Sequence, residues 1–257
     1  MPASVTIARN PFLGAVALGM ALLAQQVFAA DKAMRLAAAH MAAPARPGGP
    51  APFAKESAPE IAASHHRAFF GNARVSAEAR SIADWVVDSA DNMGLPFVIV
   101  DKRDAKVFVF DAAGRIQGSA AALLGMARGD DTVPGIGDRE YADMPLGTRT
   151  TPAGRFVASK GLDSHGVDVV WVDYEAAVAL HRVVTTNHSE RRLERLATPT
   201  PLDNRISYGC INVPIQFYEN VVSPAFTGTE GIIYVLPETR PARVVFGSYD
   251  VTRRWQR

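Results

Sequence analysis

The chain is poor in cysteine, and Cys210 is the one cysteine among its 257 residues. A single cysteine cannot form an internal disulfide, whereas exported proteins that use cysteine structurally usually hold an even number. A charge imbalance is also missing, because 27 Lys+Arg against 26 Asp+Glu leave a formal net charge of +1. Nothing in the overall charge therefore points to nucleic acid or an anionic surface, and any substrate preference must come from a local site.

Motifs for metal and phosphate binding are lacking too. The sequence has no HExxH motif and no paired cysteines, so no metal is expected. The stretch GDDTVPGIGD (residues 129–138) contains glycines but neither the lysine nor the strand-to-helix setting of a phosphate-binding loop. It predicts a long turn beside a cleft. We therefore expect the protein to work without a metal or a cofactor.

Long hydrophobic runs are absent, since the apolar run from Phe12 to Leu23 is short for a membrane span. Arg9 precedes this run, and small residues at Ala29 and Ala30 follow it, as in a cleaved export signal. We predict a signal peptide over residues 1–30, with an uncleaved N-terminal anchor as the alternative. Either case places the chain outside the cytoplasm, in the periplasm or cell envelope.

Composition then divides the rest of the chain. Residues 31–75 are rich in Ala and Pro and predict a flexible linker. Residues 76–93 have the apolar spacing of an amphipathic helix, with Ser76 as its N-cap. Residues 95–237 predict a β-rich domain, and the tail at 238–257 could add one more strand.

Short apolar runs separated by Lys, Asp and Gly turns predict the strands of this domain, with the first ones antiparallel. The runs are FVIVD, KVFVFD, IQGSAAALLG, GRFVASK, GVDVVWVDY, AVALHRVV and GIIYVL. One helix is expected around residues 214–222. Because there is no internal repeat and no alternation of strands with helices, the predicted fold class is mainly β with a few short helices.

The Gly209-Cys210 pair is the first candidate for chemistry. Glycine permits a sharp turn, and a nucleophile works best where nearby backbone amides can bind a developing oxyanion. A helix beginning just after Cys210 would lower the thiol pKa from its free value of roughly 8.5. The structural alternative is a small buried hydrophobic residue, as most free cysteines are.

A catalytic cysteine needs a base, and the sequence offers six histidines. His181 lies in the apolar run at 177–184, where a strand would place it in the core or on a cleft wall. His188 follows in a charged connector and is the second candidate. The remaining four are predicted to be solvated or merely polar: His40, His65, His66 and His165.

The segment Ser207 to Asn212, SYGCIN, preceded by His181, resembles the signature of the L,D-transpeptidase catalytic domain. FVIVDKRDAKVFVFDAAG resembles the first hairpin of that family, and Thr151 to Phe156, TPAGRF, resembles another of its segments. The resemblance covers roughly residues 95–237. It implies a β-sandwich or open barrel with a few short helices, preceded here by the N-terminal helix and linker.

By this resemblance, Cys210 is the nucleophile that forms a thioester with a peptidoglycan stem peptide, and His181 is its general base. Backbone amides around Tyr208 and Gly209 would hold the oxyanion. The acyl group would pass to an amine, which gives cross-linking, anchoring or exchange. Two alternatives stay open: a peptidase in which water resolves the thioester, and a non-catalytic wall-binding module.

The sequence departs from the family pattern in two places. Tyr208 stands where the family has His, so only backbone roles carry over to this position. His181 and Cys210 are 29 residues apart (210 − 181), a gap lengthened by an insertion that would form a lid or a surface excursion. Ser207 and Asn212 are expected to brace the loop through hydrogen bonds.

Arginines gather near the motif, and stem peptides are rich in carboxylates that arginine can bind with two hydrogen bonds. Arg205, five residues before Cys210, is the candidate for substrate contact. The arginines of the insertion predict a solvated helical face paired with neighbouring acids, and the set is Arg191, Arg192 and Arg195 with Glu190 and Glu194.

Overall fold

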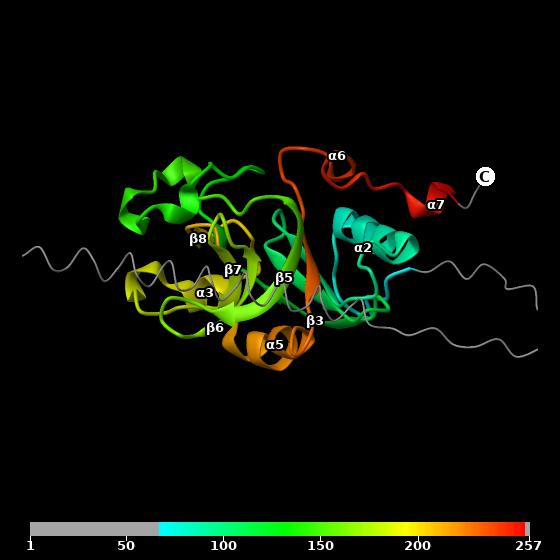
Figure 1. Ribbon diagram of the computed structural model, residues 1–257, viewed down its shortest axis with the longest axis horizontal. Helices are drawn as coiled ribbons and strands as arrows, with labels where there is room; N and C mark the ends of the chain where they lie inside the picture. The colour runs from blue at the N-terminus through cyan, green and yellow to red at the C-terminus, as the bar shows by residue number, and fades with distance from the viewer. Residues whose placement is uncertain (1–66, 255–257) are drawn as a thin grey trace, which may run out of the picture. The chain divides into compact units, whose positions relative to one another are not determined.

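A computed structural model describes residues 67–254 (Figure 1). These residues belong to one of the two units of the chain, Ile61–Arg257. The predicted signal peptide, the linker up to residue 66 and the histidines His40, His65 and His66 lie outside the described residues. Within the described part, no helix is long and apolar enough to cross a membrane.

An eight-stranded sheet organises the described unit, in the order β3-β2-β1-β10-β5-β6-β7-β9. Its strands are β1 (Phe97–Asp101), β2 (Lys106–Phe110), β3 (Ile116–Ala121), β5 (Gly154–Leu162), β6 (Asp168–Asp173), β7 (Val178–Arg182), β9 (Ile211–Val213) and β10 (Gly231–Val235). A second, two-stranded sheet joins β4 (Leu124–Gly125) to β8 (Arg205–Ser207). The prediction of a mainly β fold is confirmed.

Strand direction is mixed. β1, β2 and β3 pair antiparallel as predicted, whereas β1 with β10 and β7 with β9 pair parallel. Parallel neighbours need long crossover connections, and the one between β7 and β9 contains the insertion. The insertion folds into a 3₁₀ turn, η4 (His188–Glu190), and the short helix α3 (Arg192–Ala197).

The predicted N-terminal helix is present as α2 (Ala77–Ser89). Its first turn is capped because the Ser76 hydroxyl accepts a hydrogen bond from the Ala79 amide at 3.0 Å. The helix ends where Ala90 adopts a left-handed conformation, with φ 56°. Its apolar face buries Ile82 and Trp85 against β1, β2 and β10.

Two boundaries predicted from composition are wrong. Residues 67–75 were expected in the flexible linker, but Phe70 is only 3% exposed and packs edge-on against Phe110. The tail was expected to add a strand, yet it forms the short helices α6 (Ala242–Phe246) and α7 (Val251–Arg254). Both segments cover the same sheet face as α2, so apolar contact orders them.

The opposite face of the sheet holds the second part of the core. Alternate residues of β1, β2 and β10 point into it, which is why every residue of β1 and β10 is buried. The helix expected near 214–222 covers this face as three joined pieces, α4 (Ile215–Phe217), the π-helical η5 (Tyr218–Val222) and α5 (Ser223–Ala225). Tyr218 and Val222 are buried there.

The connection between β4 and β5 contains the predicted long turn. It carries three 3₁₀ turns, η1 (Ile136–Asp138), η2 (Tyr141–Asp143) and η3 (Leu146–Thr148), drawn in green in Figure 1. Gly137 packs against the turn between β6 and β7, since a Cβ there would lie 2.3 Å from the Glu175 carbonyl oxygen. α3 and α2 lie at opposite ends of the unit (Figure 1).

Candidate active site

The loop between β8 and β9 carries the Gly209-Cys210 pair. Gly209 has φ 145°, a conformation that side chains disfavour, and a Cβ there would lie 2.9 Å from the Thr150 carbonyl oxygen. Glycine is therefore required at this position. The segment after Cys210 is the strand β9, so the helix that would have lowered the thiol pKa is not present.

Polar side chains brace this loop on both sides. The buried Thr151 hydroxyl donates to the Gly209 carbonyl at 2.8 Å and accepts from the Gly125 amide at 2.9 Å. The Ser207 hydroxyl donates to the Cys210 carbonyl at 2.6 Å. It also accepts from the Gly209 amide at 3.2 Å, so that amide would have to leave Ser207 to bind an oxyanion.

His181 lies on β7 and pairs in register with Asn212 on β9. Cys210 lies directly before β9, and its sulfur reaches the carbonyl oxygen of Ala177, the residue directly before β7. His181 Nδ1 lies 2.7 Å from the Arg182 carbonyl oxygen. Because a carbonyl oxygen only accepts, Nδ1 carries the proton of the neutral ring, and Nε2 keeps the lone pair that a general base needs.

The Cys210 thiol is partly buried and donates to the Ala177 carbonyl oxygen at 3.5 Å. In residues 67–254, no hydrogen bond joins its sulfur to the imidazole of His181 or His188. Burial raises the pKa of the Cys210 thiol, against the lowering effects of the Ala179 backbone and of Arg192. The resting site therefore holds a neutral thiol.

Burial also lowers the pKa of His181, and the hydrogen bond to the Arg182 carbonyl opposes that shift. The Arg192 guanidinium adds to the lowering, and Asp163 acts against it. A neutral imidazole and a neutral thiol follow from these two shifts. Such a pair can work by general base catalysis, with the proton transferred as the sulfur attacks.

Asn212 is buried and links Cys210 to the insertion. Its Nδ2 makes a long hydrogen bond of 3.4 Å to the Cys210 carbonyl, and its Oδ1 accepts from Arg192 Nη1 at 2.8 Å. The contacts of Asn212 and Ser207 are those of loop support. Arg192 was expected on a solvated face, but its side chain is only 12% exposed and reaches this site.

The other two arginines of the insertion, Arg191 and Arg195, differ in their partners. Arg191 pairs with Glu194 in an exposed ion pair, as the sequence predicted. Arg195 instead donates to the backbone carbonyls of Glu190 and Asp203, at 2.7 and 2.5 Å, and so ties the ends of the insertion together. The prediction of a solvated face holds for Arg191 and is wrong for Arg195.

The Arg205 side chain belongs to a buried ionic cluster. Its Nη2 donates to Glu238 at 2.7 Å and to the Lys102 carbonyl at 2.8 Å, with the Arg205 side chain 10% exposed. Lys102 Nζ in turn donates to Asp130 at 2.9 Å and to the Thr151 carbonyl at 3.0 Å. The sequence made Arg205 the candidate for substrate contact, but these contacts favour a role in supporting the loop.

Tyr208, which stands where the resembled family has His, lies under the Arg149 guanidinium, 4.1 Å from the ring centroid. Arg149 is itself held by the Met144 carbonyl, to which Nε and Nη2 donate at 3.1 and 2.8 Å. Tyr208 therefore docks the long β4–β5 connection onto the cysteine loop. Tyr208 thus has a packing role, which differs from the proton donation that an imidazole could provide at this position.

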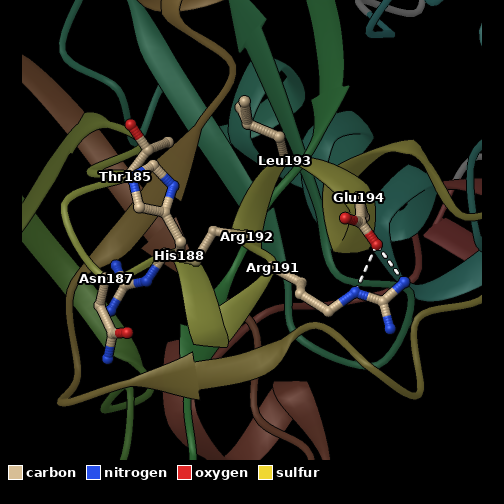
Figure 2. Close-up of a pocket in the computed structure, with 7 residues that line it drawn as sticks. All are labelled: Thr185, Asn187, His188, Arg191, Arg192, Leu193 and Glu194. Carbon is tan, nitrogen blue, oxygen red and sulfur yellow. Dashed lines mark hydrogen bonds and ion pairs between the residues drawn. The ribbon is translucent and has the colours of Figure 1, made fainter.

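His188, the second candidate base, lies on the insertion and lines a cavity of about 120 Å³ (Figure 2). The cavity is bounded by Thr185, Asn187, His188, Arg191, Arg192, Leu193 and Glu194. Arg192 thus connects this cavity to Asn212 of the cysteine loop. His165 is exposed in the turn between β5 and β6.

Sequence reasoning missed the residues that hold the site together. The sequence placed Thr151 in a segment that resembles the family but predicted no role for it. It predicted no role for Lys102, Asp130 or Glu238 either. Their partners lie far along the chain, 58 residues away for Thr151 and Gly209. The glycine-rich turn containing Asp130 was the one local signal that pointed toward this cluster.

Fold and site together describe a mainly β protein with one cysteine directly before the edge strand of its sheet and a neutral histidine on the next strand. Scans of family models and of curated proteins give no match. Solved structures with some similarity include the helical cell shape determining protein Pgp2 from Campylobacter jejuni, at 13% identity and a TM-score of 0.36. The match covers 57% of this chain and 49% of that one.

Two further structures are L,D-transpeptidases. The catalytic domain from E. faecium is 16% identical with a TM-score of 0.33, covering 55% of this chain and 96% of that domain. The enzyme from Xylanimonas cellulosilytica is 14% identical with a TM-score of 0.33, covering 55% and 60%. This chain matches about half the length of Pgp2, and at these scores the site must be judged on its own residues.

Proposed function

We propose that this chain is an exported cysteine acyltransferase of the L,D-transpeptidase type, acting on peptidoglycan stem peptides. The observation that carries the proposal is the tautomer of His181, whose Nε2 is left as a base on the strand that pairs with β9, which begins directly after Cys210. The sequence motif around Cys210 supplies the substrate class. Export rests on the apolar run at residues 12–23.

In the proposed reaction, the thiol rotates away from the Ala177 carbonyl and passes its proton to His181 Nε2 as sulfur attacks the donor carbonyl carbon. The C–N bond of the donor peptide then breaks, the leaving amine takes the proton from His181, and a thioester remains on Cys210. An acceptor amine attacks the thioester, gives a proton to His181 and restores the thiol. With water as acceptor, the same steps give a peptidase.

A carbapenem tests the nucleophile, because its strained amide acylates a reactive cysteine without needing an acceptor. The expected result is an intact-mass increase of one adduct per chain, mapped to Cys210 and absent in Cys210→Ala. A folded protein with unchanged mass would overturn the proposal and favour a wall-binding module. For a protein that does acylate, mass spectrometry of products from defined stem peptides separates transfer from hydrolysis.

The base is tested by comparing two histidine variants. His181→Ala should slow acylation by about 10²–10⁴-fold, the usual contribution of a general base, while His188→Ala should stay near the wild-type rate. Burial lowers the His181 pKa below its ordinary 6.5, so the imidazole should still be neutral at pH 6.5 and the rate should fall only at lower pH, where the imidazole becomes protonated. The opposite ranking of the two variants would move the role to His188.

A further inference from the structure

Arg192 lies on α3 of the insertion, and its charged side chain contacts Asn212, two residues after Cys210. Its Nη1 donates to Asn212 Oδ1 at 2.8 Å, and its Nε pairs with the Glu190 carboxylate. Asn212 stands opposite His181 in the strand register and two residues after Cys210. The guanidinium is therefore fixed by two partners beside the reacting pair.

Arg191, its neighbour, provides an internal comparison. The Arg191 side chain is 70% exposed and its partner is Glu194, an ion pair on the outer surface. Figure 2 shows the two guanidinium groups extending in opposite directions, with Arg191 beside Glu194 and Arg192 directed away from that pair. Two consecutive arginines therefore have different surroundings, and only Arg192 contacts the cysteine loop.

We propose that Arg192 is a positioning residue for the Cys210 nucleophile, one that holds Asn212 in place and stabilises the thiolate by its charge. The proposal rests on the proposed function of Cys210 as nucleophile. A nearby positive charge favours the ionised form of a thiol, which burial would otherwise disfavour. Glu190 shares the guanidinium and so moderates this effect.

Other groups around the thiol act differently. His181 lies on β7, opposite Asn212 in the register, Arg149 is stacked on the ring of Tyr208, and Asp163 acts on His181 from the β5–β6 turn. Arg192 lowers the pKa of both Cys210 and His181, so its effect on proton transfer between them partly cancels. Ionisation of the thiol into solvent lacks this cancellation and isolates the contribution of Arg192.

Iodoacetamide alkylation of the full chain measures that ionisation, because only the thiolate displaces iodide. We expect the midpoint of the pH–rate curve to rise by about one pH unit in Arg192→Gln. Arg191→Gln is the matched control and should leave the midpoint unchanged. Glu190→Gln should lower the midpoint, since the guanidinium then loses its opposing carboxylate, and a purely structural role for Arg192 predicts no such reversal of sign.

Circular dichroism checks that each variant is folded. If Arg192→Gln does not fold, Arg192→Lys and Glu190→Gln carry the test: the first keeps the charge and should remain within about half a pH unit of wild type, and the second should fall below it. Two variants decide the test, Arg192→Gln, where it folds, and Glu190→Gln. A wild-type midpoint in each folded one would overturn the proposal. Alkylation needs no peptide, so shifted midpoints without a carbapenem adduct would reject the proposed function alone.

Discussion

Two regions of the sheet are held together by different means. At β1, β2 and β10, apolar side chains fill both faces, with α2, α6 and α7 on one side and the helical segment α4–α5 on the other. At the edge formed by β7 and β9, the cysteine loop is held by hydrogen bonds between side chains and backbone. The first region is held by the burial of apolar side chains, and the second is held by directional hydrogen bonds.

The difference explains how a thiol can be placed accurately at a sheet edge. Apolar packing is not directional, so it stabilises the strands without fixing where one atom lies. Hydrogen bonds to the Gly209 and Cys210 carbonyls restrict the loop backbone directly. The doubly covered strands are thus stabilised by burial, and the braces set the position of the Cys210 thiol.

The largest expected effect lies in the apolar region and tests its corrected boundary. Phe70→Ala should lower the free energy of unfolding by about 3–5 kcal/mol, because a nearly buried ring packed against Phe108 and Phe110 is lost. Phe69→Ala, at a neighbouring position that is 65% exposed, should change it by no more than about 0.5 kcal/mol. Urea denaturation of both variants measures the contrast.

Equal effects for the two phenylalanines would contradict the placement of residues 67–75 on the core. They would return this segment to the linker that its composition predicted. The measurement therefore decides where the folded unit begins, which composition alone placed several residues too late.

The sequence predicts the apolar region well for a physical reason. Runs such as FVIVD and GIIYVL consist mostly of apolar residues, which indicate a buried strand without information from the rest of the chain. Local composition is therefore enough to place β1, β10 and the other long strands. α2 was predicted because its apolar spacing and its Ser76 cap are also local. The prediction of a strand in the tail failed because the segment ARVVF, with four apolar residues among five, fits a strand or a short helix equally well.

The site was predictable only in part. Cys210 and His181 were found through a motif, and His181 lies on the strand β7 where the sequence expected one. The roles of Thr151 and Arg192 could not be inferred, because a hydrogen bond across 58 or 20 residues leaves no periodic pattern. Arg192 and Arg191 are chemically identical neighbours, and only the fold distinguishes them.

A medium effect is expected where the braces replace apolar packing. Thr151→Val keeps the side-chain shape but leaves the buried Gly209 carbonyl and Gly125 amide without their partner. The free energy of unfolding should fall by about 2–3 kcal/mol. Thr151→Ser retains the hydroxyl and should lose only about 1 kcal/mol with its methyl group.

Carbapenem acylation sharpens the same comparison, since a brace should affect the rate as well as the stability. Thr151→Val should slow acylation of the folded protein, whereas Thr151→Ser and Phe69→Ala should not. If Thr151→Val were as stable and as reactive as wild type, the loop would owe its position to some other contact.

The smallest effect is expected where the β4–β5 connection contacts the cysteine loop, at the half-buried ring of Tyr208 beneath Arg149. A double-mutant cycle with Tyr208→Leu and Arg149→Gln should give a coupling of about 0.5–1 kcal/mol in the free energy of unfolding. The cycle is needed because Arg149 also donates twice to the Met144 carbonyl, and those bonds cancel between its two arms. A coupling near zero would mean that the β4–β5 connection is docked by those backbone contacts instead, and that the Tyr208 ring only fills space in the cysteine loop.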